Sequence, residues 1–256
     1  MQNKSKIKSF EKMKIFAIVE ARMTSSRLPG KVLLEADGKP MLEHLINRLK
    51  SIKLLTGIVL ATTTNQDDDV LERFSKKHEI ELYRGSEDDV MMRVIEAAES
   101  VKADIVVEIT GDCPVIDPQI VEQTIRTFKA NNADYVSNNN IKSYPDGMDT
   151  QVFWLDTLKK SASMTDNKLD HEHVTLHIRN NPNLFSQLNL VAPPEIDWPE
   201  LGLTLDEKDD YILLKKIIEF FGSQNELFSC LDIVQFLKKN PELVSINNAV
   251  IRKGDT

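Results

Sequence analysis

Cysteine is scarce in this sequence, with Cys113 and Cys230 as the 2 cysteines among 256 residues. They lie far apart in the chain, and two such residues make neither a disulfide framework nor a metal site of the usual spacing. No apolar run approaches the roughly 18 residues that a membrane-spanning helix needs. The segment 1–13 carries four lysines but lacks the apolar core of a signal peptide. We therefore expect a cytoplasmic protein with no membrane partner and a solvated basic tail over residues 1–13.

Basic residues are also in the minority. The chain has 32 Lys and Arg against 40 Asp and Glu, which gives a formal net charge of −8. Because affinity for nucleic acids comes mainly from Lys and Arg side chains on phosphates, this balance argues against a nucleic acid partner. It leaves room for a small basic pocket that binds a nucleotide.

Hydrophobic residues make up 41% of the chain and charged residues 28%, as in an ordinary globular domain with a modest extension. Up to residue 136, short apolar runs typical of buried strands alternate with segments whose apolar residues recur at helical spacing. This alternation indicates an α/β fold with a parallel sheet covered on both faces, and with ligands beyond the carboxyl ends of its strands. We expect strands at 14–19, 57–61, 81–83, 103–109 and 134–136, and helices at 41–49, 67–77, 88–101 and 117–130.

Beyond residue 136 the alternation loosens, and a polar run, a Pro-Asp-Gly turn signal and several prolines interrupt it. The segment of about 138–200 keeps apolar residues, so we expect it to form an arm that packs on a second subunit. Residues 14–225 then make one domain that includes this arm, and residues 226–256 make a C-terminal helical extension. Here we expect a strand at 151–154, helices at 155–163, 171–179, 209–221 and 230–239, a connector at 191–199, and a short apolar run at 203–205.

A basic loop follows the first expected strand. Residues 20–31 hold three cations, three hydroxyl side chains and a Pro-Gly pair. Backbone N–H groups and hydroxyls donate to phosphoryl oxygens, Arg and Lys offset their charge, and Pro-Gly gives a fixed turn with room for close approach. The residue order of a Walker phosphate-binding loop, G-x-x-x-x-G-K-[ST], is absent. A solvated basic loop with no ligand would have the same composition. We favour a triphosphate site, with cations Arg22, Arg27 and Lys31 and hydroxyls from Thr24, Ser25 and Ser26.

Two aspartates each follow an apolar run. Asp112 comes just after the central run 103–109, with Gly111 beside it. Asp206 follows the run 203–205 before a helix, and we expect this run to be a short strand that ends at the same edge of the sheet. Mg²⁺ in proteins usually takes one or two carboxylates together with substrate phosphates. Aspartate is also common at turns and helix starts, so capping is the alternative for each residue. A magnesium site shared by the two aspartates is a hypothesis from position.

Four further polar residues give weaker signals. Arg84 follows a short strand and could reach a nucleotide, although a surface position is as plausible. Asp146 and Asp149 flank a glycine turn, and His173 lies in a polar stretch, so we assign these three residues to the acceptor substrate. His171 and His173 lack the i,i+4 spacing of a helical zinc site.

Several motifs occur together and in order. The chain resembles the CMP-sugar-acid synthetases, which include 3-deoxy-manno-octulosonate and sialic acid cytidylyltransferases, and it looks most like their spore coat polysaccharide biosynthesis protein F branch. The resemblance runs from about 14 to 221. It rests on Ala21-Arg22-x-x-Ser25-x-Arg27-Leu28-Pro29-Gly30-Lys31, Gly38-Lys39-Pro40-Met41, Thr110-Gly111-Asp112-Cys113-Pro114, and the segments 84–90, 144–149, 172–175 and 205–206.

The resemblance implies a three-layer nucleotidyltransferase fold of the glycosyltransferase-A type, with dimerisation through the arm. It implies a Mg²⁺-dependent cytidylyltransferase that transfers CMP from CTP to an acidic sugar and releases pyrophosphate. The acceptor oxygen attacks the α-phosphorus in line, and no enzyme nucleophile is needed. One rival interpretation is a sugar-1-phosphate nucleotidylyltransferase that uses another nucleoside triphosphate. Another is a glycosyltransferase, although these usually carry Asp-x-Asp, and the acidic cluster 67–69 here opens a helix.

The resemblance also implies roles for individual residues. Two residues differ from the family pattern and affect these roles. Glu20 stands where many synthetases have proline or glutamine, and Thr110 stands where the octulosonate enzymes have glutamine. The expected site comprises Arg22, Lys31 and Asp112 in catalysis; Ala21, Arg22, Ser25, Arg27, Lys31, Arg84, Thr110 and Asp112 on the nucleotide; Asp146, Asp149 and His173 on the acceptor; and Asp112 and Asp206 on Mg²⁺.

Overall fold

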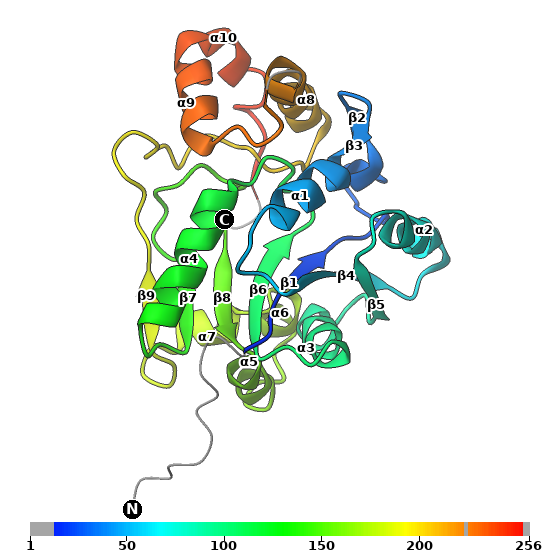
Figure 1. Ribbon diagram of the computed structural model, residues 1–256, viewed down its shortest axis with the longest axis vertical. Helices are drawn as coiled ribbons and strands as arrows, with labels where there is room; N and C mark the ends of the chain where they lie inside the picture. The colour runs from blue at the N-terminus through cyan, green and yellow to red at the C-terminus, as the bar shows by residue number, and fades with distance from the viewer. Residues whose placement is uncertain (1–12, 223–224, 253–256) are drawn as a thin grey trace, which may run out of the picture.

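The computed structural model describes residues 13–222 and 225–252 (Figure 1). Its centre is a seven-stranded sheet. The strands, in their order across the sheet, are β5 (Glu81–Gly85), β4 (Gly57–Thr63), β1 (Ile15–Glu20), β6 (Ile105–Thr110), β8 (Gln151–Trp154), β7 (Tyr135–Ser137) and β9 (Gln187–Asn189). Strand β8 runs antiparallel to β6 and β7, and the other pairs in this sheet are parallel. The expected α/β class with a mostly parallel sheet is confirmed.

Strand β1 shows why the sheet needs helices on both faces. Ile15, Ala17 and Val19 pack into one core cluster and Phe16 and Ile18 into another, and all five are buried. An unbroken apolar run of this kind is typical of a strand covered on two sides. Burial of a side chain such as Ile18 stabilises the fold by about 1.5–3 kcal/mol.

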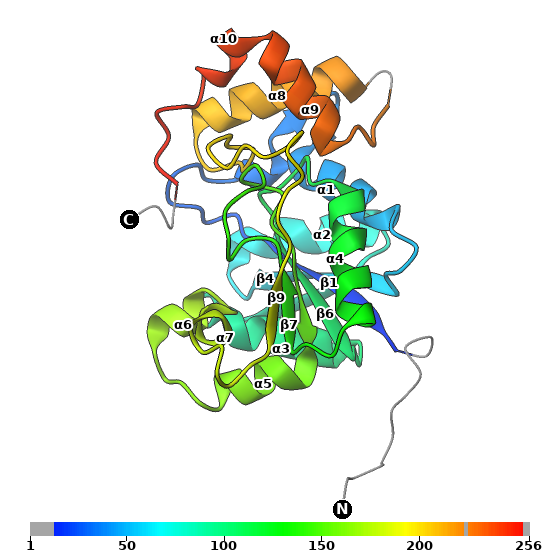
Figure 2. The same ribbon diagram turned by 90° about the vertical axis from the view of Figure 1, so that its left-hand side faces the viewer.

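Helices form a layer on each face of the sheet (Figure 2). One face packs against α1 (Met41–Lys50), α2 (Asp69–Lys77) and α4 (Pro118–Ala130). The other face packs against α3 (Val90–Ser100), α5 (Leu155–Ala162) and α7 (Leu176–Asn180). This is the three-layer arrangement that the resemblance implies.

The C-terminal helices gather at the end of the molecule toward which β6 points (Figure 1). They are α8 (Lys208–Gly222), α9 (Cys230–Lys239) and α10 (Pro241–Val244). Their apolar residues pack with one another and with Met41, Leu203 and Leu205 in a third core cluster. Four short elements lie earlier in the chain: η2 (Lys31–Leu33), β2 (Glu35–Ala36), β3 (Lys39–Pro40) and η3 (Gln66–Asp68).

Two elements differ from expectation. The single helix expected at 171–179 is two short helices, α6 (Lys168–Glu172) and α7. Val174 lies between them with φ of 45°, a left-handed conformation that ends a helix and is unfavourable for a β-branched residue. Strand β9 is not among the expected strands, because its sequence Gln-Leu-Asn has no apolar run. It becomes a strand by pairing with β7 at the edge of the sheet.

The apolar run 203–205 is not a strand. Its leucines are fully buried, but the only pairing the structure describes beside it is a single isolated bridge. The Leu205 N–H donates instead to the carbonyl oxygen of Asp112 at 2.8 Å. Asp206 therefore reaches the edge of the sheet on a loop, and the expectation that it ends a strand is corrected.

The expected arm at 138–200 is largely part of the chain's own fold. Strand β8 lies inside the sheet and β9 at its edge, while α5, α6 and α7 lie near α3. Contact of this segment with a second subunit stays a prediction. The basic tail 1–13 lies outside the described residues except for Met13. Among the helices that the structure describes, none has the length and apolar character to cross a membrane.

Candidate active site

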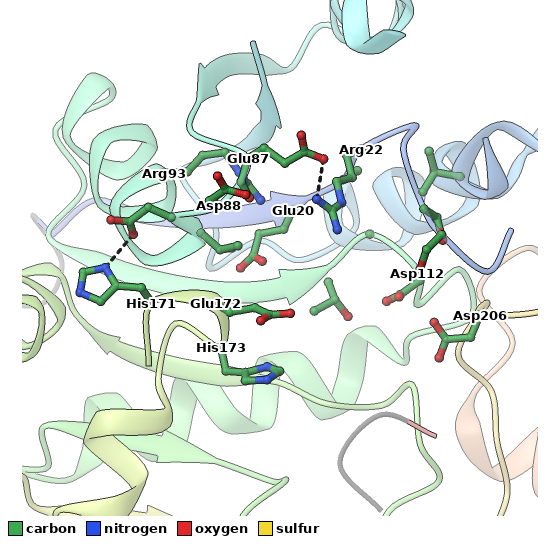
Figure 3. Close-up of a pocket in the computed structure, with 18 of the residues that line it drawn as sticks. Glu20, Arg22, Glu87, Asp88, Arg93, Asp112, His171, Glu172, His173 and Asp206 are labelled. Carbon is green, nitrogen blue, oxygen red and sulfur yellow. Dashed lines mark hydrogen bonds and ion pairs between the residues drawn. The ribbon is translucent and has the colours of Figure 1, made fainter. Parts of the chain in front are cut away.

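A cleft of about 890 Å³ opens beyond the carboxyl ends of β1 and β6 (Figure 3). It is lined by the loop after β1, the residues that lead into α3, the turn after β6, the segment around α6, and Asp206. This is the sheet edge at which open α/β proteins bind ligands. Of the expected site residues, the cleft brings together Ala21, Arg22, Ser25, Arg27, Lys31, Thr110, Asp112, His173 and Asp206.

The loop after β1 is anchored by its own backbone and by a buried aspartate. The Met23 N–H donates to Asp68 Oδ1 at 2.7 Å, and the Gly30 N–H donates to the Met23 carbonyl oxygen at 2.9 Å. Gly30 has φ of 70°, a conformation that favours glycine. Asp68 is fully buried, so this member of the acidic cluster 67–69 supports the loop and does not face the cleft.

The Lys31 ammonium joins the two aspartates. Its Nζ lies 2.9 Å from Asp112 Oδ2 and 3.0 Å from Asp206 Oδ1, and Figure 3 shows the two carboxylates side by side at one end of the cleft. Burial disfavours the charged forms, but the attraction between them outweighs burial, so the pKa of Lys31 is raised and that of Asp112 is lowered. Arg27 Nη2 lies 2.7 Å from Asp206 Oδ1.

The carboxylate of Asp206 does not cap α8. It faces Lys31 and Arg27, while the backbone N–H groups of Asp206 and Glu207 donate to Asp210 Oδ2 at 3.1 and 2.9 Å. Asp210 is fully buried and satisfies the backbone just before the helix. The geometry therefore rules out the capping alternative for Asp206, whose carboxylate lies in the cleft and pairs with Lys31 and Arg27.

Two carboxylates that converge on one cation are a donor set that fits Mg²⁺ when substrate phosphates complete its coordination. In the part of the chain that the structure describes, no group of three or more His, Cys, Asp or Glu side chains is arranged to hold a metal. An ion in this cleft would therefore depend on Asp112, Asp206 and the phosphates.

Arg22 is paired at the mouth of the cleft. Its Nη1 lies 2.7 Å from Glu87 Oε1, and Thr24 and Asn65 donate to the same carboxylate at 2.9 and 2.6 Å. The hydrogen bonds from Asn65 and Thr24, followed by the charge of Arg22, lower the pKa of Glu87. Exposed ion pairs contribute only about 0–1 kcal/mol, so a phosphate can displace Glu87 from Arg22.

The carboxyl group of Glu20 forms the floor of the cleft, and the buried carboxyl group of Glu108 lies beside it. Glu20 points into the cleft (Figure 3), and its Oε1 is buried without a hydrogen-bond partner among the described residues. Burial raises the pKa of Glu20 to about 7, and burial together with Glu20 raises the pKa of Glu108 well above its ordinary value. The charge of Glu20 acts on Glu108, so the two groups titrate as a pair. Gln151 Nε2 donates to Glu108 Oε2 at 2.7 Å.

Three expected residues surround this floor with few contacts of their own. Thr110 is the register partner of Glu20 across β6 and β1. Ala21 follows Glu20 and is buried, and Ser25 Oγ accepts a long hydrogen bond from the Leu28 N–H at 3.5 Å. Thr110 Oγ1 already lies 3.2 Å from Cys113 Sγ, whereas the Ser25 hydroxyl is available to a ligand.

The two histidines near α6 have different surroundings. His171 Nδ1 lies 2.8 Å from Asp89 Oδ1 and its Nε2 lies 3.0 Å from the Thr165 carbonyl oxygen. The hydrogen bond to Asp89, then that to Thr165, raises the pKa of His171. Figure 3 shows His173 along the cleft between His171 and Asp112. His171 thus supports the wall of the cleft, and His173 faces a ligand.

Three expected residues do not line the cleft. Arg84 donates to the carbonyl oxygens of Thr63 and Asn65 at 2.9 and 2.7 Å, so it braces the loop after β4. Asp146 and Asp149 lie in the turn that follows Tyr144. Burial, followed by the charge of Asp146, raises the pKa of Asp149 to about 7.

That turn packs on the segment that carries Asp206. Gly147 has φ of 100°, and a Cβ there would lie 2.7 Å from the carbonyl group of Leu203. Thr204 Oγ1 donates to Asp146 Oδ2 at 3.0 Å. The turn therefore lies behind Asp206 and does not reach the opening of the cleft.

Sequence reasoning missed three charged residues that support the site. Glu108 has a visible signal, because it is a charged residue inside the apolar run 103–109. Asp210 has a weaker one, as an acidic residue four positions after Asp206. Arg252 has none, because its partners Thr204 and Asp210 are 48 and 42 positions away in the chain.

Comparison with known proteins adds independent information. A family model described as cytidylyltransferase matches residues 16–235. The spore coat polysaccharide biosynthesis protein SpsF of Bacillus subtilis is 31% identical over 242 residues, which cover 92% of this chain and 98% of that protein. The 3-deoxy-manno-octulosonate cytidylyltransferase of Geobacter metallireducens is 27% identical over 208 residues, which cover 71% and 81%. A solved cytidylyltransferase from Leptospira borgpetersenii matches with a TM-score of 0.87 and 33% identity, over 94% of this chain and 99% of that one.

Proposed function

The chain belongs to the cytidylyltransferase family, and on that premise we propose that it transfers CMP from CTP to a sugar acid with release of pyrophosphate. The observation that carries the proposal is the convergence of the basic loop, Lys31, Asp112 and Asp206 in one cleft. The names of two relatives, an octulosonate cytidylyltransferase and a spore coat polysaccharide biosynthesis protein, support a sugar acid as acceptor and a role in surface polysaccharide biosynthesis.

We assign the triphosphate to the loop after β1. Without a nucleotide, its three cations pair with carboxylates: Arg22 with Glu87, and Arg27 and Lys31 with Asp206. Phosphate oxygens can take over these cations, and each charge-assisted hydrogen bond contributes about 1.5–3 kcal/mol. Further contacts to the nucleotide come from Ala21, Ser25 and Thr110.

The residues of the cleft act by position and charge. Asp112 and Asp206 would hold Mg²⁺, which when bound offsets the charge of the α-phosphate and the leaving pyrophosphate. The loop cations hold the outer phosphates, so that an acceptor oxygen can approach the α-phosphorus in line with the leaving oxygen. No covalent intermediate is required. Cys113 is unsuited to form one, because burial raises the pKa of its thiol well above the ordinary value.

The acceptor is proposed to contact His173, and Asp146 and Asp149 are proposed to support the acceptor site from behind the cleft. His173 faces the cleft, while the two aspartates lie behind the loop that carries Asp206. Glu20 adds a group that the sugar acid can meet, because burial raises the pKa of its carboxyl group to about 7 and its protonated form is therefore populated near neutral pH. A protonated carboxyl donates a hydrogen bond to a carboxylate or hydroxyl oxygen without bringing a negative charge.

A pyrophosphate-release screen tests the proposal. The arms are CTP, ATP, GTP and UTP with Mg²⁺, each with a panel of keto-sugar acids and of sugar-1-phosphates. We expect release with CTP and a keto-sugar acid, and loss of release in Lys31→Met. Lys215→Met, an exposed lysine on α8, is the matched control. Release with a sugar-1-phosphate and another nucleotide would favour the rival nucleotidylyltransferase, and sugar transfer without pyrophosphate would indicate a glycosyltransferase.

We further propose a cytoplasmic homodimer that forms through the segment 138–200. Six of the ten large hydrophobic side chains that are exposed among the described residues lie in this segment, and three of them, Ile141, Leu188 and Val191, lie on or beside β9. An exposed edge strand with apolar side chains on and beside it is a surface that proteins usually cover. A second copy of this chain would cover it.

A further inference from the structure

The C-terminal segment returns to the active site beyond residue 235, where the family match ends. Its residue Arg252 is mostly buried, with 14% of the side chain exposed. The guanidinium Nη2 lies 2.7 Å from Asp210 Oδ1, and Nη1 donates to Thr204 Oγ1 at 2.8 Å. Arg252 therefore enters the loop that carries Asp206 from outside the part of the chain that defines the family.

Asp210 connects Arg252 to Asp206. Its buried carboxylate accepts from the backbone N–H groups of Asp206 and Glu207 on one oxygen, and from Asn247 and Arg252 on the other. A buried carboxylate that loses its cationic partner is strongly destabilised. The position of the Asp206 backbone therefore depends on Arg252.

The same guanidinium also contacts Asp146, both directly and through Thr204. Nε of Arg252 lies 3.5 Å from Asp146 Oδ2, and Thr204 Oγ1 accepts from Arg252 while it donates to Asp146. Nη1 also lies 4.0 Å from Asp206 Oδ2. The Arg252 side chain thus lies between Asp206, the proposed metal ligand, and Asp146, which is proposed to support the acceptor site.

The fold leaves room for this side chain. Gly202 lies against the guanidinium, and a Cβ at this position would overlap Nη2 and Cζ of Arg252. Asn247 Nδ2 donates to the Gly202 carbonyl oxygen at 3.0 Å, and Arg27 Nη1 donates to the Ile251 carbonyl oxygen at 3.0 Å. The C-terminal segment is therefore tied to both sides of the cleft entrance, at the triphosphate loop and at the loop before α8.

We propose that Arg252 is a positioning residue for the reaction, which sets Asp206 through Asp210 and Asp146 through Thr204. This inference rests on the proposed function. The three guanidinium nitrogens contact three different partners. A lysine could therefore neutralise Asp210 but could not make all three contacts.

The first test needs no substrate. Amide hydrogen exchange at Asp206 and Glu207 is compared in the full chain and in Arg252→Ala and Gly202→Ala. The Gly202 variant keeps the arginine but displaces its end. We expect exchange at these amides to rise about tenfold or more in both variants, because they lose the support of Asp210. Ile251→Ala is the control, since that side chain is 72% exposed and only its carbonyl is used. Unchanged exchange in both variants would overturn the link between Arg252 and Asp206.

The second test separates positioning from charge balance. Pyrophosphate release is measured with CTP and 3-deoxy-manno-octulosonate, together with the melting temperature. We expect kcat to fall about tenfold or more in Arg252→Ala and Gly202→Ala, with KM for CTP changed less than about threefold. Arg252→Lys should recover the melting temperature but not kcat. Recovery of both would mean that Arg252 only neutralises Asp210. If the wild-type protein releases no pyrophosphate with this acid, the comparison is made with the keto-sugar acid of the panel that gives release. If none gives release with CTP, the proposed function fails, while the exchange experiment still decides whether Arg252 positions Asp206.

Discussion

The backbone N–H of Leu205 donates a hydrogen bond to the carbonyl oxygen of Asp112 at 2.8 Å. This bond joins the loop before α8 to the turn after β6, and it brings the carboxylates of Asp112 and Asp206 to the same ammonium group. Because the two loops are joined through their backbones, the aspartate side chains can be changed without removing the contact that holds the loops together.

Asp112→Asn and Asp206→Asn should each stay folded and lose about 100-fold or more in turnover, because an amide keeps the shape of the side chain but is a poor ligand for Mg²⁺. Pyrophosphate release and melting temperature are measured on the same samples. Asp67→Asn, an exposed residue outside the cleft, is the control. A loss of only a few-fold in either variant, at unchanged melting temperature, would remove that residue from the metal site.

Arg27→Ala should abolish the rise in melting temperature that CTP and Mg²⁺ cause in the wild-type protein. The loss of a charge-assisted phosphate contact should weaken binding by about 1.5–3 kcal/mol. Because Arg27 also contacts Asp206 and Ile251, the quantity to compare is the shift on adding CTP, not the melting temperature itself. Arg126→Ala, on the exposed side of α4, should keep the full shift. An equal shift in Arg27→Ala would take the loop out of the nucleotide site.

Asp149→Asn should flatten the pH dependence of stability. Burial, followed by the charge of Asp146, raises the pKa of Asp149 to about 7 from an ordinary value of 3.8. The folded protein therefore holds a proton that the unfolded chain releases, so this group favours folding at low pH and the contribution is lost as the pH rises through 7. The melting temperature should fall more steeply between about pH 4 and 7 in the wild-type protein than in the variant. Parallel curves would contradict the shifted pKa.

Leu188→Arg should convert the proposed dimer to a monomer, because it places a charge on the exposed apolar edge of β9. Leu231→Arg on α9 is a matched control, since both leucines are 38% exposed. Light scattering at micromolar concentration distinguishes the two species. A monomeric wild-type protein would count against assembly, and a dimer that survives Leu188→Arg would move the interface away from β9.

The central strands could be predicted from the sequence because their apolar runs are unbroken. The run 103–109 needs no partner to be recognised, and β6 lies almost where it was expected. Strand β9 could not be predicted in this way, because Gln-Leu-Asn becomes a strand only through its ladder with β7. The break at Val174 was equally invisible, since its left-handed backbone follows from the packing around α6 and α7.

The residues of the candidate site fall into the same two groups: those that the sequence reveals and those that only the fold brings together. The basic loop and Asp112 follow strand ends, and position alone was enough to select them. Asp206 was selected for a reason that the structure corrects, because a backbone hydrogen bond and not a strand brings it to the cleft. The pairing of Glu20 with Glu108 and the return of Arg252 depend on contacts that only the folded chain makes.

Two carboxylates that lie close together repel each other, and this repulsion destabilises the folded enzyme between turnovers. The Lys31 ammonium offsets this repulsion, because it forms ion pairs with both Asp112 and Asp206. The scaffold then has no need of a divalent ion to stay intact. A chelator such as EDTA should stop turnover and leave the melting temperature of the resting protein where it was, and an unfolding transition that moves with EDTA would contradict this. The proposed metal ion would then come and go with the nucleotide, as part of each catalytic cycle, and a cell short of magnesium would keep an intact, idle pool of this enzyme.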